Sequence, residues 1–127
     1  MGRRSKIKAR DLVQSFPLLH KISQAKSKDV RKLIGSAEQK QKDLLCRCVE
    51  LGLRNLSEKK FSPAQLKKMY AVEEKLNFLS SYAKCSGAKR KCLYHQQNKN
   101  IVQSGQGIGI LLSAILPIIA NLILKHV

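Results

Sequence analysis

Apolar residues recur at intervals of three and four along much of the chain, the spacing that places them on one face of an α-helix. The clearest case begins with Ser62, Pro63 and Gln65, which together form a helix start signal. The apolar positions that follow are Leu66, Met69, Val72, Leu76 and Leu79. This pattern predicts an amphipathic helix from Ser62 to about Tyr82.

Three shorter helices are predicted before this one. The first begins near Pro17, at an early position where no amide donor is needed. The second spans residues 27–35, with Ser27 as its cap and a glycine at its end. Ser36 is expected to cap the third, which covers residues 37–53. No alternating run of β-branched residues predicts a strand, so the expected fold class is all-α, a small bundle of three or four short helices.

Composition divides the chain into four parts. Residues 1–10 form a basic arm, expected to be disordered until it meets a polyanion. Residues 11–83 form the helical domain. Residues 84–106 carry no acidic residue, and we expect a basic, flexible, mostly irregular linker there. Residues 107–127 are expected to form a C-terminal hydrophobic helix. The predicted core consists of Leu33, Ile34, Leu45, Cys48, Val49, Leu66, Met69, Val72, Leu76 and Leu79.

Charge sharpens this picture. Lys and Arg number 25 against 8 Asp and Glu, giving a formal net charge of +17. Such an excess predicts a polyanionic partner, and the preference for Lys suits charge neutralisation rather than base recognition. Low aromatic content argues against a base-stacking platform. We expect sequence-independent, salt-sensitive binding to double-stranded DNA, with RNA association and an ordinary solvated surface as alternatives. The predicted phosphate contacts are Arg3, Arg4, Lys6, Lys8, Arg10, Lys89, Arg90, Lys91 and Lys99.

The uncharged C-terminal run 108–124 suggests three alternatives. It lies near the lower length limit for spanning a bilayer, and it could instead lie in the membrane interface. The third alternative is burial against a capsid-type protein or another copy of the chain. The residues assigned to this membrane or capsid segment are Ile108, Ile110, Leu111, Leu112, Ile115, Leu116, Ile118, Ile119, Leu122, Ile123 and Leu124.

Metal and catalytic chemistry find little support. The four cysteines are Cys46, Cys48, Cys85 and Cys92. Their spacing, even with His95 added, is not that of common zinc sites, and Cys46 and Cys48 point to different faces of a helix. We expect Cys48 in the core, reduced thiols, no metal and no cofactor. No histidine has a catalytic partner at a recognisable spacing, and the glycines at 105–109 lack a phosphate-loop pattern, so no enzyme is expected.

The order of features resembles the small core protein X (the mu precursor) of adenoviruses, in which a basic body precedes a glycine-containing junction and an apolar C-terminus. The match here lies in residues 107–112 and 116–120. The lysine-rich helical body is closer to the X-like proteins of Maverick/Polinton elements and adintoviruses. The similar segments are 18–22, 30–34, 44–56 and 62–66. This resemblance implies a minor virion or core protein that neutralises packaged double-stranded DNA, located in the virion and the host nucleus.

The resemblance also implies a proteolytic site. Adenoviral precursors are cut by a viral cysteine protease at a hydrophobic-x-Gly-x-Gly consensus. Gly105 and Gly107 match its glycines, whereas Gln103 replaces the hydrophobic residue. A cut is expected after Gln106, and an uncut flexible hinge is the alternative. A rival function is a tail-anchored or membrane-active protein on an intracellular membrane, with a basic cytosolic helical domain.

Overall fold

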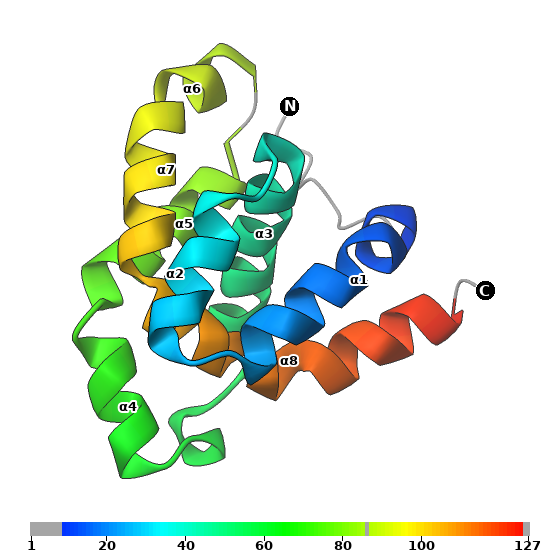
Figure 1. Ribbon diagram of the computed structural model, residues 1–127, viewed down its shortest axis with the longest axis vertical. Coiled ribbons are helices and arrows are strands. Elements are labelled where there is room, and N and C mark those ends of the chain that lie inside the picture. Colours follow the sequence, from blue (N-terminus) through cyan, green and yellow to red (C-terminus); the bar gives the residue numbers. More distant parts are fainter. Residues whose placement is uncertain (1–8, 86, 126–127) are drawn as a thin grey trace.

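A computed structural model describes residues 9–85 and 87–125, which form eight α-helices and one short 3-10 helix, with no strand in these residues (Figure 1). The all-α prediction is confirmed. The elements are α1 (Ala9–Gln24), α2 (Ser27–Gly35), α3 (Gln39–Asn55), η1 (Glu58–Lys60), α4 (Pro63–Tyr70), α5 (Glu73–Ala83), α6 (Gly87–Cys92), α7 (Tyr94–Gln103) and α8 (Gly105–Lys125).

A local start signal explains the position of α4. Helix α2 has the predicted span, but its N-cap residue is Lys26, which makes no side-chain capping bond, so the prediction of Ser27 as its cap was wrong. At α4, the backbone N–H of Gln65 donates to Ser62 Oγ at 3.2 Å, and the backbone N–H of Ser62 donates to Gln65 Oε1 at 2.9 Å. This is the predicted capping box, which satisfies two amides that have no partner within the helix.

The predicted start of the third helix was wrong. Its N-cap is Glu38, whose backbone N–H donates to Gln41 Oε1 at 3.0 Å. Ser36 belongs to the end of α2 instead, because its hydroxyl donates to the carbonyl of Lys32 at 3.0 Å. The first helix also differs, since α1 places Pro17 in its interior rather than in its first turn.

The long helix predicted from Ser62 to Tyr82 is divided between α4 and α5. Val72 adopts φ −121° and ψ 21°, outside the helical region, and its N–H bonds to the carbonyl of Met69 at 3.1 Å. The break lets α4 pack against α8 while α5 packs against α3. A single straight helix over the same residues would not place its apolar side chains against both α8 and α3.

The irregular linker expected over residues 84–106 was also wrong, because most of this segment forms α6 and α7. Helix α7 packs against α5 and α2, and it buries Gln97 and Ile101 completely. Leu93, Tyr94 and Val102 are partly buried against the core. These apolar residues lie at helical spacing among lysines and amides, which obscured the amphipathic pattern.

The C-terminal apolar segment is a helix, as predicted, but it is buried against the chain itself. Helix α8 contacts α1, α2, α3, α4 and α7, and in Figure 1 it runs beside α1. Its buried side chains are Ile108, Leu111, Leu112, Ile115 and Ile119. Ile110, Leu116 and Ile118 are partly exposed, and Leu124 is 71% exposed. The side chains of Leu122 and Ile123 lie outside the described set.

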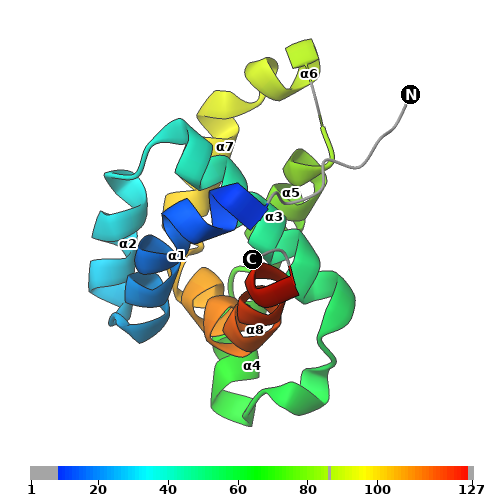
Figure 2. The same ribbon diagram turned by 90° about the vertical axis from the view of Figure 1, so that its right-hand side faces the viewer.

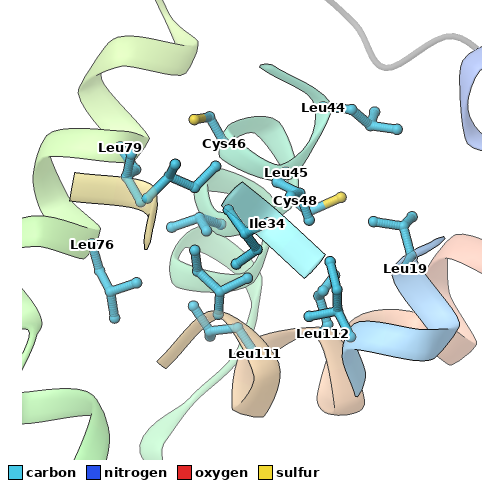
Figure 3. Close-up of a cluster of buried hydrophobic side chains, with 14 of the residues drawn as sticks. Leu19, Ile34, Leu44, Leu45, Cys46, Cys48, Leu76, Leu79, Leu111 and Leu112 are labelled. Atoms are coloured by element: carbon cyan, nitrogen blue, oxygen red, sulfur yellow. The ribbon is translucent and has the colours of Figure 1, made fainter. Parts of the chain in front are cut away.

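The core lies where α8 meets the other helices. Figure 3 shows Leu111 and Leu112 of α8 near Ile34 of α2 and Leu45 of α3. All of the predicted core residues are buried except Leu33 and Leu66, which are partly exposed. Leu12, Leu19 and Ile22 of α1 complete the core. Each such side chain stabilises the fold by about 1.5–3 kcal/mol when removed from water.

The α7–α8 corner depends on a glycine. Helix α8 leaves α7 at an angle of 78°. A Cβ atom at Gly107 would lie 2.9 Å from Val72 Cγ2 and 3.1 Å from Leu76 Cδ1. Gly107 therefore permits close packing against the junction of α4 and α5, which is a different role from that of a flexible hinge.

Gly107→Ala should reduce the free energy of unfolding by about 1–3 kcal/mol relative to Gly109→Ala, because its new methyl group overpacks the corner. Gly109 is a matched control on the same helix, since its added Cβ would meet no atom closer than 3.7 Å. Urea denaturation followed by circular dichroism measures both. Equal stability of the two variants would contradict the close-packing role.

Candidate nucleic-acid interface

The surface is rich in unneutralised cations. The exposed Lys and Arg residues are Arg10, Lys21, Lys26, Lys28, Arg31, Lys32, Lys40, Arg54, Lys59, Lys60, Lys67, Lys68, Lys84, Lys89, Lys91 and Lys99. Three ion pairs occur among the described residues, and they join Lys40 to Asp11, Arg54 to Glu50 and Arg90 to Asp43. Most exposed cations in this part of the chain are therefore available to a polyanion.

The predicted phosphate contacts fall into three groups. Arg10, Lys89, Lys91 and Lys99 are exposed. The other four basic residues of the arm, Arg3, Arg4, Lys6 and Lys8, lie outside the described residues. Arg90 differs from both groups because its side chain is only 14% exposed.

Arg90 is a structural residue in this fold, which corrects its prediction as a phosphate contact. Its Nη1 lies 3.7 Å from Asp43 Oδ2. Its Nε and Nη2 donate to the carbonyls of Cys85 and Ala83 at 3.0 and 3.3 Å. The guanidinium also sits 5.2 Å from the centroid of the Tyr82 ring, a cation–π arrangement. It therefore fastens α6 to α5 and α3.

Asp43 is the centre of this arrangement. Its Oδ1 accepts hydrogen bonds from the Tyr82 hydroxyl at 2.8 Å and from Gln39 Nε2 at 3.0 Å. The same Gln39 nitrogen lies 3.2 Å from Gln97 Oε1 on α7. Burial, together with the hydrogen bond to Asp43, raises the pKa of Tyr82 well above its usual range. One carboxylate thus links α3, α5 and α6, and its neighbour Gln39 extends the network to α7.

Two groups of lysines lie on separate elements. The α6 surface consists of Lys84, Lys89 and Lys91, all exposed on or just before α6. The α4 surface consists of Lys59, Lys60, Lys67 and Lys68, all exposed on η1 and α4. Sequence reasoning missed the α4 surface. Lys67 and Lys68 lie between Leu66 and Met69 of a predicted helix, and Lys59 and Lys60 precede its start signal. The available signal was that Lys67 and Lys68 fall off the apolar face of that amphipathic helix.

The α4 surface adjoins the α7–α8 corner. Gln106 Nε2 donates to the carbonyl of Lys68 at 3.3 Å. On the other side of this corner, Arg31 of α2 packs its aliphatic chain over Gly105, where an added Cβ would lie 3.2 Å from Arg31 Cγ. The corner thus holds a further exposed cation, on α2.

The corner also contains the predicted cleavage site. Gln103 is exposed, but Ser104, Gly105 and Gly107 are buried. The backbone N–H of Ser104 donates to the carbonyl of Asn100 at 2.9 Å, which continues the helical pattern to the end of α7, and its hydroxyl donates to the same carbonyl at 2.7 Å. A protease that needs an extended substrate would reach the bond after Gln106 only if this corner opened.

The cysteines divide into buried and accessible pairs. Cys46 and Cys48 are buried, whereas Cys85 is partly exposed and Cys92 is exposed. Burial raises the pKa of each buried thiol to about 12, and Cys46 Sγ accepts a hydrogen bond from Gln97 Nε2 at 3.3 Å. Within residues 9–85 and 87–125, no group of three or more His, Cys, Asp or Glu side chains is arranged to hold a metal ion.

No single helix within residues 9–85 and 87–125 has the length and hydropathy needed to cross a membrane. Helix α7 and the first part of α8 together have that length and composition, as a pair bent by 78°. No known protein family, curated protein or solved structure matches this chain.

Tyr82→Phe should lower the free energy of unfolding by about 1.5–3 kcal/mol, because it removes a buried hydrogen bond to a carboxylate. Tyr94→Phe is the matched control. Its ring lies 6.4 Å from that of Tyr82, and we expect it to be nearly neutral. Chemical denaturation measures both variants. Comparable losses would show that the hydroxyl bond to Asp43 is not what stabilises this region.

The free energy of unfolding should fall as the pH rises from about 8 to about 10. In this window the unfolded thiols lose protons near their ordinary pKa of 9.0, while folded Cys46 and Cys48 keep theirs because their pKa is about 12. The folded state then binds more protons, so rising pH favours unfolding. The double variant Cys46→Ala/Cys48→Ala should show a shallower slope and Cys92→Ala an unchanged one. An unchanged slope in the double variant would refute this assignment.

Proposed function

We propose that this protein is a non-enzymatic DNA-binding protein of the virion-core type, which neutralises double-stranded DNA without reading its sequence. The observation that carries the proposal is the excess of exposed Lys and Arg over ion pairs on a packed helical body. Point charges of this kind neutralise phosphates and release condensed counterions, whatever the base sequence. Four of the phosphate contacts predicted from the sequence are exposed, namely Arg10, Lys89, Lys91 and Lys99. We add the lysines of the α4 surface and Arg31 as further phosphate contacts.

The virion-core part of the proposal comes from the resemblance to X-like proteins described above, which implies packaged DNA as the ligand. Capsid protein, a viral cysteine protease, the virion and the host nucleus belong to the same hypothesis. The geometry limits one element of it. Five apolar side chains of α8 already lie in the core, so contact with a capsid or a membrane is left to Leu124 and to the partly exposed Ile110, Leu116 and Ile118.

The rival membrane function requires α8 to leave the core. That step would expose side chains that each contribute about 1.5–3 kcal/mol when buried, a cost the membrane would have to offset. The same cost applies to proteolytic release of the segment after Gln106. We therefore favour DNA neutralisation by the intact helical body.

Binding to duplex DNA should weaken about a thousandfold or more between roughly 50 and 200 mM salt, provided that about six or more phosphates are contacted. Fluorescence anisotropy with two duplexes of unrelated sequence measures this, and the two should bind equally. Single-stranded DNA and double-stranded RNA serve as competitors. A flat salt response, or preferential binding of A-form RNA, would overturn the proposal.

A charge-conserving variant provides the control. Lys84, Lys89 and Lys91 changed together to Arg should bind DNA like the native chain, whereas the same three residues changed to Gln should reduce the salt slope by up to about 3. Because both triple variants alter the same exposed positions, any folding effect is shared. Equal slopes for the two variants would exclude the α6 surface as a contact.

A further inference from the structure

The α6 and α4 surfaces lie at opposite ends of the molecule. With the longest axis vertical, α6 is at the top and α4 at the bottom, and this holds after a turn of 90° about that axis (Figures 1 and 2). The α6 surface carries Lys84, Lys89 and Lys91, and the α4 surface carries Lys59, Lys60, Lys67 and Lys68. A single duplex lying against one end would leave the other end uncovered.

The spacing between the two ends is fixed by helices. Helix α5, with 11 residues, runs between them and is about 16 Å long. This exceeds the Debye length of about 8 Å at physiological ionic strength, so the two sets of lysines are largely screened from each other. Each end can therefore accept its own phosphates without a penalty from the other.

Both ends are anchored to the body by specific contacts. Arg90 ties α6 to Asp43 of α3 and to the carbonyls of Ala83 and Cys85. At the other end, Gln106 of α8 bonds to the carbonyl of Lys68. A flexible basic linker could fold back onto one duplex, whereas these contacts hold the α6 and α4 surfaces apart.

Few acidic residues oppose either surface. Asp43, the carboxylate bound to α6, is occupied by Arg90 and Tyr82 and is largely buried. Glu58 begins η1, next to Lys59 in the chain. Glu73 and Glu74 follow the α4 surface but begin α5, where their charges lie favourably in the first helical turn. The α4 surface keeps more cations than adjacent acids, although its excess is smaller than that of the α6 surface.

We propose that one molecule of this protein bridges two DNA duplexes, one held by the α6 surface and the other by the α4 surface. This inference rests on the proposed DNA-binding function and goes beyond it, because neutralisation alone needs only one duplex per molecule. The ligand at both ends is the phosphate backbone, which exposed lysines contact without sequence preference.

A two-duplex capture assay tests the proposal. A biotinylated duplex is immobilised, and the full-length protein is added below saturation, followed by a fluorescent duplex of different sequence. The native chain should capture the second duplex. Two triple variants, Lys84/Lys89/Lys91→Gln and Lys60/Lys67/Lys68→Gln, should still bind the first duplex but capture the second roughly tenfold less or worse.

A third triple variant is the matched control. Lys26, Lys28 and Lys32 are exposed residues on and beside α2, between the two ends, and changing them to Gln removes the same charge. This control should capture the second duplex nearly as well as the native chain. Loss of capture equal to that of the other two variants would overturn the two-ended geometry, because total charge would then explain the effect.

Mixing the two end variants distinguishes bridging by one molecule from bridging by self-association. If one molecule spans both duplexes, an equimolar mixture should not recover capture. Recovery would show that separate copies join to bridge, and it would overturn the proposal. Binding of the native chain to one duplex without capture of a second would refute bridging alone. Absence of binding to any duplex would refute the proposed function itself.

Discussion

The constraint on which this fold depends is that an uncharged apolar segment must be kept from water. Helix α8 meets this need inside its own chain, against α1, α2, α3, α4 and α7. Since burial of apolar area is the dominant favourable term in folding, the other helices are organised around α8. The 78° turn from α7 makes this possible, because it directs the segment back into the body. Gly107 allows that turn to pack closely against Val72 and Leu76.

A second constraint follows from the scarcity of acidic residues. With 8 Asp and Glu against 25 Lys and Arg, few carboxylates are available to balance cations inside the fold. Asp43 serves several partners at once, since it accepts bonds from Tyr82 and Gln39 and pairs with Arg90. Because Arg90 pairs with Asp43, its side chain is largely buried and is not part of the cationic surface. Most lysines in the described part of the chain are exposed, so the structural Arg90 is distinct from the cations at the surface.

The features predictable from sequence were those set by neighbouring residues. The span of α2 and the Ser62–Gln65 capping box depend on contacts within a few positions, and the apolar periodicity identified most of the core. The break between α4 and α5 could not be predicted this way, because it reflects packing against α8 and α3. The same holds for Arg90, whose partner Asp43 is remote in sequence. The apolar C-terminus was assigned to an external partner because composition alone does not reveal an internal one.

Burial of the apolar core favours the compact state, whereas repulsion among the surface cations opposes it. Added salt should strengthen folding, because it screens this repulsion, and should weaken binding to a polyanion. A net charge of +17 makes the folded chain repel itself, so counterions or a polyanion that screen this charge should favour the compact state. Salt should also weaken the proposed DNA binding, because it reduces the gain from counterion release. DNA that binds only the folded chain would stabilise it by mass action. Stability at low salt should then depend most on DNA, since self-repulsion and binding are both strongest there.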